Sequence, residues 1–88
     1  MLKLFITGRT ARSELAVRNL ERICERDLGG RFELVVIDIL EQPDEAQQGR
    51  ILATPTVVKE LPPPMRRVVG DLSDKQKVLA GLGLQPAP

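Results

Sequence analysis

Hydrophobic and polar residues alternate at the start of the chain. Leu2, Leu4 and Ile6 occupy every second position, and Lys3 lies between the first two. Successive side chains of a β-strand point to opposite faces of its sheet, so this period of two predicts a strand. Residues 8–10 predict a turn after it, because they begin with glycine and continue with polar residues.

The pattern becomes helical after this turn. Apolar residues recur at spacings of three and four, which place them on one face of an amphipathic helix. They are Val17, Leu20, Cys24 and Leu28. Ser13 is the expected N-terminal cap. Gly29 and Gly30 are expected to end the helix, since glycine adopts the left-handed conformation without a steric penalty.

An apolar run from residue 32 to residue 40 predicts a second strand. Residues 34–37 are all apolar, which favours a strand that is covered on both faces. A strand, a helix and a second buried strand form a βαβ unit, whose two strands are parallel. The polar residues 43–49 that follow predict a short helix or a loop.

The last third of the chain contains strong local signals. Prolines at 62–64 exclude a central strand or helix at that point. The β-branched pair Val68 and Val69 favours a strand. Ser73 and Gln76 match a capping box, which predicts a final helix near residues 74–82.

Length and composition indicate one small domain. The chain has 88 residues, and we expect a domain over residues 1–84 with a disordered tail at 85–88. The net charge of +1 and the presence of two phenylalanines as the only aromatic residues argue against nucleic-acid binding. No apolar run approaches the length of a membrane span, so we expect no membrane association. The single cysteine and the absence of histidine are typical of a protein in a reducing cytosol, so we expect a cytoplasmic location.

Residues with catalytic chemistry are scarce. The chain has no histidine and a single cysteine, Cys24, which lies on the apolar face of the predicted helix. This composition excludes an intrachain disulfide and disfavours a zinc site. We therefore predict a non-enzymatic protein without a metal or other cofactor.

Residues 53–57 resemble the cis-proline segment of thioredoxin-like folds. Thr54 and Pro55 hold the position at which a Thr-Pro bond precedes a strand, and a cis bond costs little before proline. In those folds the cis bond exposes the preceding backbone edge to a partner. The Cys-x-x-Cys that thioredoxins carry after the first strand is absent, because residues 8–13 contain no cysteine. A divergent thioredoxin-like oxidoreductase is one alternative interpretation.

Four segments together resemble the KaiB family of circadian clock proteins. They are LKLFITG at 2–8, VIDIL at 36–40, ILATPT at 51–56 and LPPPMRRVVGDLSD at 61–74. The resemblance implies a non-enzymatic regulator that binds the N-terminal ATPase ring of a KaiC-type protein, displaces the sensor kinase SasA and helps to sequester KaiA. A SasA-like input domain of a sensor kinase is a second alternative.

The resemblance also implies a metamorphic protein with two folds. One is a thioredoxin-like monomer of element order βαβαββα, and the other is a ground-state fold, often tetrameric, with a rearranged second half. Local signals conflict here, because residues 62–64 could open a helical turn and residues 78–82 could form a strand. We favour the thioredoxin-like α/β fold, because the capping box and the hairpin agree and because Gly81 and Gly83 suit a last strand poorly.

The expected contact surface for the KaiC-type partner is the second helical stretch and the edge before Pro55. Its candidate residues are Arg50, Ile51, Leu52, Ala53, Thr54, Lys59, Arg66, Arg67 and Lys3. Arg50 is favoured because an exposed guanidinium can pair bidentately with a carboxylate. Neighbouring residues of a strand point to opposite faces, so at most one arginine of the 66–67 pair is expected to meet a given partner. Gly70 and Asp71 are expected to be turn or switch residues.

Overall fold

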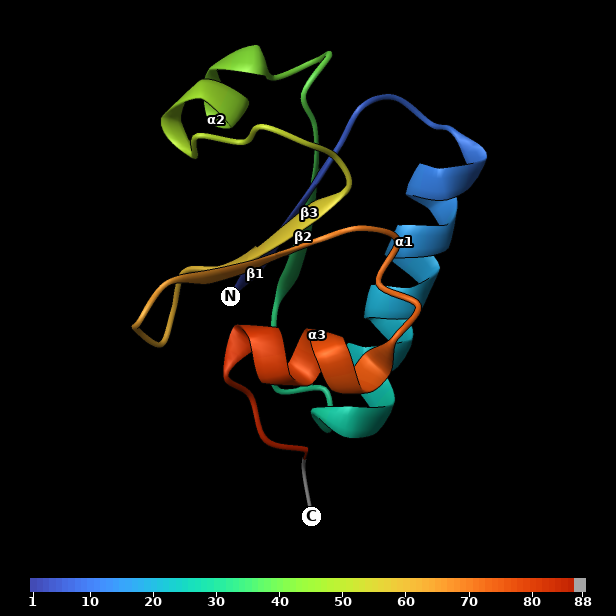
Figure 1. Ribbon diagram of the computed structural model, residues 1–88, viewed down its shortest axis with the longest axis vertical. Coiled ribbons are helices and arrows are strands. Elements are labelled where there is room, and N and C mark those ends of the chain that lie inside the picture. Colours follow the sequence, from blue (N-terminus) through green and yellow to red (C-terminus); the bar gives the residue numbers. More distant parts are fainter. Residues whose placement is uncertain (87–88) are drawn as a thin grey trace.

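The computed structural model describes residues 1–86 of the chain. Residues 85 and 86 are exposed and have no regular secondary structure, and residues 87 and 88, the rest of the expected tail, lie outside the described residues. Figure 1 shows a sheet with helices on both of its faces. The predicted α/β class is therefore confirmed.

The sheet has four strands in the order β2-β1-β3-β4. The strands are β1 (Leu2–Ile6), β2 (Leu34–Asp38), β3 (Thr56–Lys59) and β4 (Arg66–Val69). β1 pairs in parallel with β2 and antiparallel with β3, and β3 pairs antiparallel with β4. The parallel β1–β2 pair with the helix between its strands is the predicted βαβ unit.

In the described part of the chain, three α-helices and one π-helical segment pack around this sheet. The α-helices are α1 (Ala11–Arg22), α2 (Pro43–Gln48) and α3 (Lys75–Leu82), and the π-helical segment η1 (Ile23–Asp27) continues α1. Figure 1 shows α1 and α3 on one face of the sheet and α2 on the other. The order of elements is that of the thioredoxin-like fold, which the sequence favoured over the rearranged alternative.

The core is divided by the sheet into a large and a small cluster. On the side of α1 and α3, Leu4, Leu20, Val57 and Val78 belong to one extensive buried cluster. On the side of α2, a smaller cluster is formed by Phe5, Ile37 and Val58 with Ile51 packed against it. The short helix α2 therefore leaves much of its face of the sheet available for a groove.

β2 is packed on both faces, as expected, but its burial is incomplete. Leu34 and Val36 pack against the large cluster and Val35 against the small cluster, to which Ile37 belongs. Among the five residues of β2 only Ile37 is buried, because β2 is an edge strand of the sheet formed by the described residues. An apolar run indicates a strand, but it does not fix the place of that strand in the sheet.

Both predicted helix caps are displaced from the expected residues. Thr10 caps α1, with its Oγ1 accepting a hydrogen bond from the amide of Ser13 at 3.1 Å, and Ser13 itself is buried in the first turn. Asp74 caps α3 by accepting a bond from the amide of Lys77 at 3.1 Å. Ser73 lies one residue too early, and its amide donates to the Asp71 carboxylate.

Two glycines determine how α3 ends and how it packs. Gly83 has a left-handed conformation with φ of 67° and ends the helix, which is the usual role of glycine at this position. Gly81 faces β4, and a Cβ placed on it would lie 2.5 Å from Cγ2 of Val68. The absence of a side chain at Gly81 therefore allows α3 to approach the sheet closely.

Candidate functional site

Four loops meet at one edge of the sheet. β1, β2 and β4 end at this edge, and β3, which runs antiparallel to β1 and β4, begins there. We call this surface the loop edge and define it as residues 7–9, 38–40, 50–55 and 69–71. It contains Pro55 and most of the residues that the sequence proposed for partner binding.

Asp38 holds two of these loops in place. Its Oδ1 accepts hydrogen bonds from the amides of Gly8 and Leu40, each at 3.0 Å. Hydrogen bonds to an ionised carboxylate are stronger than those between neutral groups, so this pair of bonds fixes the two loops relative to each other. Asp38 is the last residue of β2, and its bond with Gly8 joins segments 30 residues apart.

The cis Thr54–Pro55 bond is embedded in a network of short hydrogen bonds. The hydroxyl oxygens of Thr54 and Thr7 lie 2.7 Å apart, and Thr56 Oγ1 donates to the carbonyl of Ala53 at 2.6 Å. The amide of Gly70 donates to the carbonyl of Pro55 at 2.9 Å. Gly70 lies in the bend after β4, and this bond together with the threonine hydrogen bonds holds the segment before Pro55 in a defined conformation.

Leu52 is the most exposed large apolar side chain of the loop edge. It is 98% exposed, which exceeds every other large hydrophobic residue among residues 1–86. Leu40 is 69% exposed in a neighbouring loop. Ile51 differs, because it is half-buried and packs against the small cluster. An apolar side chain that remains in water beside an ordered backbone is suited to burial against a partner.

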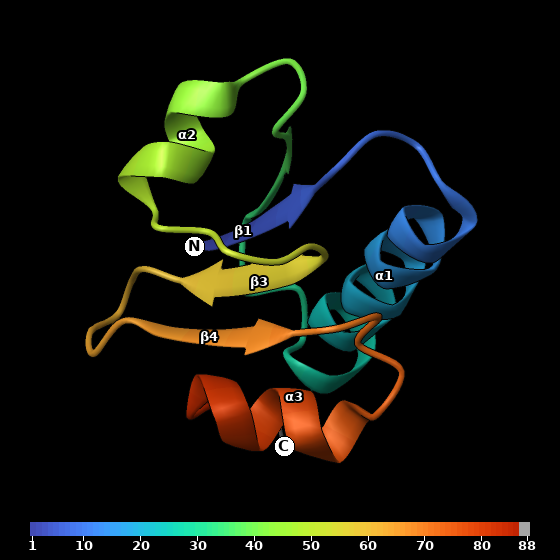
Figure 2. The ribbon, with the colours of Figure 1, turned by 45° about the horizontal axis from the view of Figure 1, so that its top comes forward.

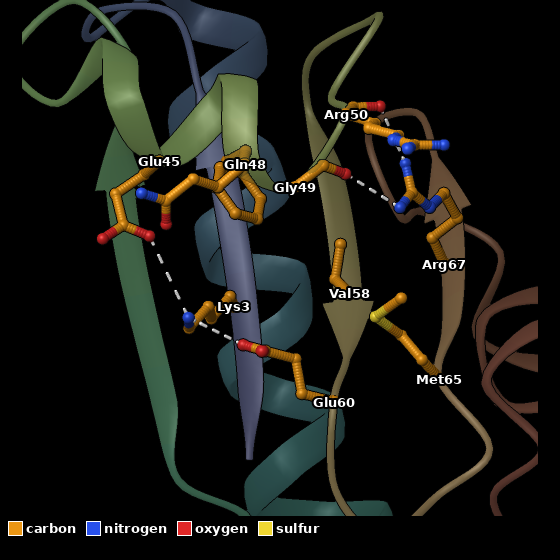
Figure 3. Close-up of a pocket in the computed structure, with 10 residues that line it drawn as sticks. Lys3, Glu45, Gln48, Gly49, Arg50, Val58, Glu60, Met65 and Arg67 are labelled. Carbon is orange, nitrogen blue, oxygen red and sulfur yellow. Dashed lines mark hydrogen bonds and ion pairs between the residues drawn. The ribbon is translucent and has the colours of Figure 1, made fainter.

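Arg67 connects β4 to the end of α2. Its Nη1 donates to the carbonyl of Arg50 at 3.0 Å and its Nη2 to the carbonyl of Gly49 at 2.9 Å (Figure 3). Arg50 follows α2 with a positive φ of 53°, and its side chain is exposed. Arg67 therefore positions the segment that leads to Leu52, a role that the sequence did not reveal.

Removal of the Arg67 guanidinium should loosen this segment. We expect Arg67→Ala to accelerate amide hydrogen exchange by about tenfold at Arg50 and Ile51, whose amides donate to the carbonyls of Gln47 and Ala46. The reason is that the carbonyls of Gly49 and Arg50 lose charge-assisted bonds worth about 1 kcal/mol or more. Arg67→Lys should restore little of the lost protection against exchange, because an ammonium group lacks the planar pair of N–H donors of a guanidinium. Residue-resolved exchange by NMR measures the effect, and unchanged exchange at both amides would contradict this role. Exchange at core strand β1 serves as the internal control.

A groove lies beside these residues on the α2 face of the sheet. Its volume is about 560 Å³, and Phe5, Val58 and Met65 contribute apolar lining. Figure 3 shows Val58 and Met65 beside the ionic side chains of this groove. Lys3, a partner candidate from the sequence, lies in this groove and pairs with Glu60 at 2.7 Å and, more distantly, with Glu45 at 4.0 Å. The hydrogen bond to Glu60 raises the pKa of Lys3, so its charge is already compensated within the chain.

The remaining candidates are dispersed. Lys59 is 3% exposed, which leaves little of its side chain for a partner. Arg66 is exposed and lies next to Gly83 on the opposite face from Arg67, as expected for neighbouring residues of a strand. Hydrogen bonds from Ser73 lower the pKa of Asp71, which forms part of the turn after β4. Arg50, Leu52, Ala53 and Thr54 are the candidates that remain together at the loop edge.

Cys24 is a buried, free thiol. Burial raises its pKa, and the nearby Glu21 and Glu25 carboxylates act in the same direction. Thiolates, not thiols, are the reactive species, so this environment opposes redox chemistry. The described residues 1–86 also contain no group of three or more histidine, cysteine, aspartate or glutamate side chains arranged to hold a metal ion.

The thiol environment predicts slow labelling of the native chain. At pH 8 we expect Cys24 to react with a thiol reagent at least roughly tenfold more slowly than in the urea-unfolded chain. Because the native thiol keeps its proton where the unfolded thiol ionises, stability should fall as the pH rises above the unfolded pKa of about 8.5. Equal labelling rates in the two states, or glutathione exchange lost in Cys24→Ser, would contradict this assignment.

Among residues 1–86, none of the helices is both long enough and apolar enough to cross a bilayer.

Sequence comparisons point to one family. The family model for the KaiB domain matches residues 3–84. The circadian clock protein KaiB3 of Synechocystis is 48% identical over 86 residues, which cover 98% of this chain and 84% of that protein. The circadian clock oscillator protein KaiB of a Prochlorococcus marinus strain is 51% identical over 84 residues, with coverages of 96% and 78%.

Solved structures show the same architecture. The N-terminal domain of Synechococcus elongatus SasA is similar with a TM-score of 0.74 and 25% identity, covering 90% of this chain and 75% of that one. A chloroplastic thioredoxin z matches with a TM-score of 0.68, 26% identity and coverages of 93% and 76%. Mitochondrial thioredoxin 3 of Saccharomyces cerevisiae, at 16% identity, shares the fold with a TM-score of 0.69 over 93% of this chain and 74% of its own. The thioredoxin-like fold expected from the sequence is confirmed.

Proposed function

The chain belongs to the KaiB family of circadian clock proteins, and we propose that it is a non-enzymatic regulator that binds the N-terminal ATPase ring of a KaiC-type protein in the cytoplasm. Identities near 50% over almost the whole chain support a clock role. The buried Cys24 thiol argues against the oxidoreductase alternative, whose chemistry needs an accessible thiolate.

The loop edge carries this proposal, and the exposure of Leu52 is the observation on which it rests. A Leu side chain buried on binding contributes about 1.5–3 kcal/mol. Beside it, the exposed guanidinium of Arg50 is free of any ion pair among residues 1–86 and can meet a carboxylate of the ring. An apolar anchor next to an unpaired cation is a common arrangement at protein interfaces.

We further propose that the chain interacts with other clock proteins and that it exchanges between two folds. In this proposal the thioredoxin-like form is a monomer that binds the ring, competes with SasA and assists in sequestering KaiA. A ground-state form, tetrameric and with a rearranged second half, exchanges with it. The similarity of the thioredoxin-like form to the SasA N-terminal domain supports competition for one site, because two proteins of like shape can occupy it in turn.

Complex formation tests the proposal directly. The full chain, incubated for hours with the ATPase ring of a KaiC-type protein, should co-elute with it in size-exclusion chromatography with light-scattering detection. The long incubation allows for slow exchange between folds. An unchanged ring mass with every KaiC-type ring tried, after incubation over hours, would contradict the proposal.

A further inference from the structure

The outer edge of β4 presents unpaired backbone groups. Among residues 1–86, β4 is the last strand of the sheet and pairs with β3 alone (Figure 2). Residues of an antiparallel pair alternate between those that bond to the neighbouring strand and those whose backbone groups point away. The bond from Gly70 N to Pro55 O fixes this alternation, so the N–H and C=O groups of Arg67 and Val69 point outward.

The β1–β3 pair gives the same alternation independently. The amide of Glu60 donates to the carbonyl of Met1. Because bonding residues alternate along a strand, Val58 and Thr56 of β3 also direct their backbone groups to β1. Val57 and Lys59, which lie between them, direct their backbone groups to β4. Their partners in β4 therefore face inward, and Arg67 and Val69 are left with two donors and two acceptors at the edge.

The side chains along this edge are basic or apolar. Arg66 and Arg67 lie next to each other in β4, and Val69 is 59% exposed. No ion pair among the described residues involves Arg66 or Arg67. The Arg67 guanidinium donates to the carbonyls of Gly49 and Arg50, which carry no net charge, so its positive charge is not neutralised. Like charges disfavour a second copy of the chain in this position, since its own arginines would lie opposite these. Carboxylates opposite the arginines would instead be stabilising.

We propose that the outer edge of β4 binds an extended acidic segment of another protein by strand addition. The backbone of the segment pairs with Arg67 and Val69, and carboxylates lie opposite Arg66 and Arg67. The segment residue opposite Val69 is expected to be apolar, because directly opposite side chains of paired strands contact each other. This residue and the one opposite Arg67 lie on the same face of the segment. Main-chain bonds supply affinity in this mode and the alternating side chains supply specificity. The site is separate from the loop edge contact made by Leu52.

A short peptide provides the probe. The acetylated and amidated hexapeptide Thr-Val-Thr-Glu-Glu-Thr, paired antiparallel, places its valine opposite Val69 and its glutamates opposite Arg67 and Arg66. In an NMR titration of the full chain we expect saturable shifts, largest at the amides of Arg67 and Val69, and slower hydrogen exchange of both amides. The same peptide with lysines in place of the glutamates should give no saturable shift.

A matched pair of variants separates backbone pairing from simple charge attraction. Val69→Pro removes one outward N–H, and proline is tolerated at edge positions whose N–H faces solvent. We expect it to weaken peptide binding at least roughly tenfold, whereas Val69→Thr keeps the N–H and should bind as the native chain does. If Val69→Pro does not fold, Arg66→Glu replaces it and should weaken binding of the acidic peptide while improving binding of the lysine peptide.

Three outcomes would overturn the proposal. They are equal binding to Val69→Pro and Val69→Thr, peptide-induced shifts centred on residues 50–55, and concentration-dependent shifts of β4 without peptide, which would show self-pairing. Because the probe contains no part of a KaiC-type protein, failure here leaves the ring-binding result unaffected, and the reverse is also true.

Discussion

Leu52→Glu is expected to lower the affinity of the chain for a KaiC-type ATPase ring by roughly 30-fold, equivalent to about 2 kcal/mol. The native side chain is 98% exposed in the free chain and would become buried in the complex. The variant loses this apolar burial and places an additional charge in the interface, where its desolvation is unfavourable. Calorimetric or fluorescence titration with the isolated ring measures the change.

A matched control exists at the opposite end of the sheet. Leu61 is 61% exposed in the hairpin between β3 and β4, away from the loop edge. Leu61→Glu should bind the ring with native affinity, and both variants should unfold within about 0.5 kcal/mol of the native chain because the substituted side chains are exposed. Equal losses of affinity in the two variants would refute a specific role for Leu52.

Gly81→Ala is expected to reduce the free energy of unfolding by up to about 2 kcal/mol. Alanine favours a helix over glycine by about 1 kcal/mol, but a Cβ at this position would lie 2.5 Å from Cγ2 of Val68. Relief of such overpacking costs about 1–3 kcal/mol, and the β-branched Val68 side chain has few rotamers to escape into. The loss is large for a chain of 88 residues, whose total stability is about 4–13 kcal/mol.

The Val68→Ala background separates the clash from other effects. Once the Val68 methyl groups are absent, Gly81→Ala should become stabilising by up to about 1 kcal/mol, because only the helix propensity remains. Urea denaturation of the four proteins of this double-mutant cycle gives the coupling energy. Destabilisation by Gly81→Ala of equal size in both backgrounds would show that contact with Val68 is not the cause.

The elements of this chain could be predicted from the sequence where a local pattern decides them. The alternation of Leu2, Leu4 and Ile6 and the three- and four-residue spacing after Thr10 are properties of a few neighbouring residues. The cap positions could not be fixed in this way, because Thr10 and Ser13 are both good capping residues. The loop geometry that places Thr10 Oγ1 beside the Ser13 amide decides between them.

The second half of the chain needed tertiary information. The sequence allowed a strand or a helix after residue 62, and the packing of α3 on β4 through Gly81 accompanies the thioredoxin-like outcome.

The candidate site was also predicted only in part. Arg50 to Thr54 lie together because they are consecutive, whereas the bonds from Arg67 span 17 and 18 residues and have no local signal. The burial of Lys59 could not be predicted from the sequence either, because it depends on the helices that cover its face of the sheet.

Hydrogen–deuterium exchange of the chain in complex with a KaiC-type ring tests the central claim most directly. If the loop edge is the contact surface, protection relative to the free chain should be greatest at the amides of residues 50–54. Little change is expected at Leu61 and Met65, the residues of the 61–65 hairpin that carry a backbone amide. Both segments belong to one chain in one sample, so each is the control for the other. Protection confined to Leu61 and Met65, with residues 50–54 exchanging as in the free chain, would contradict the account.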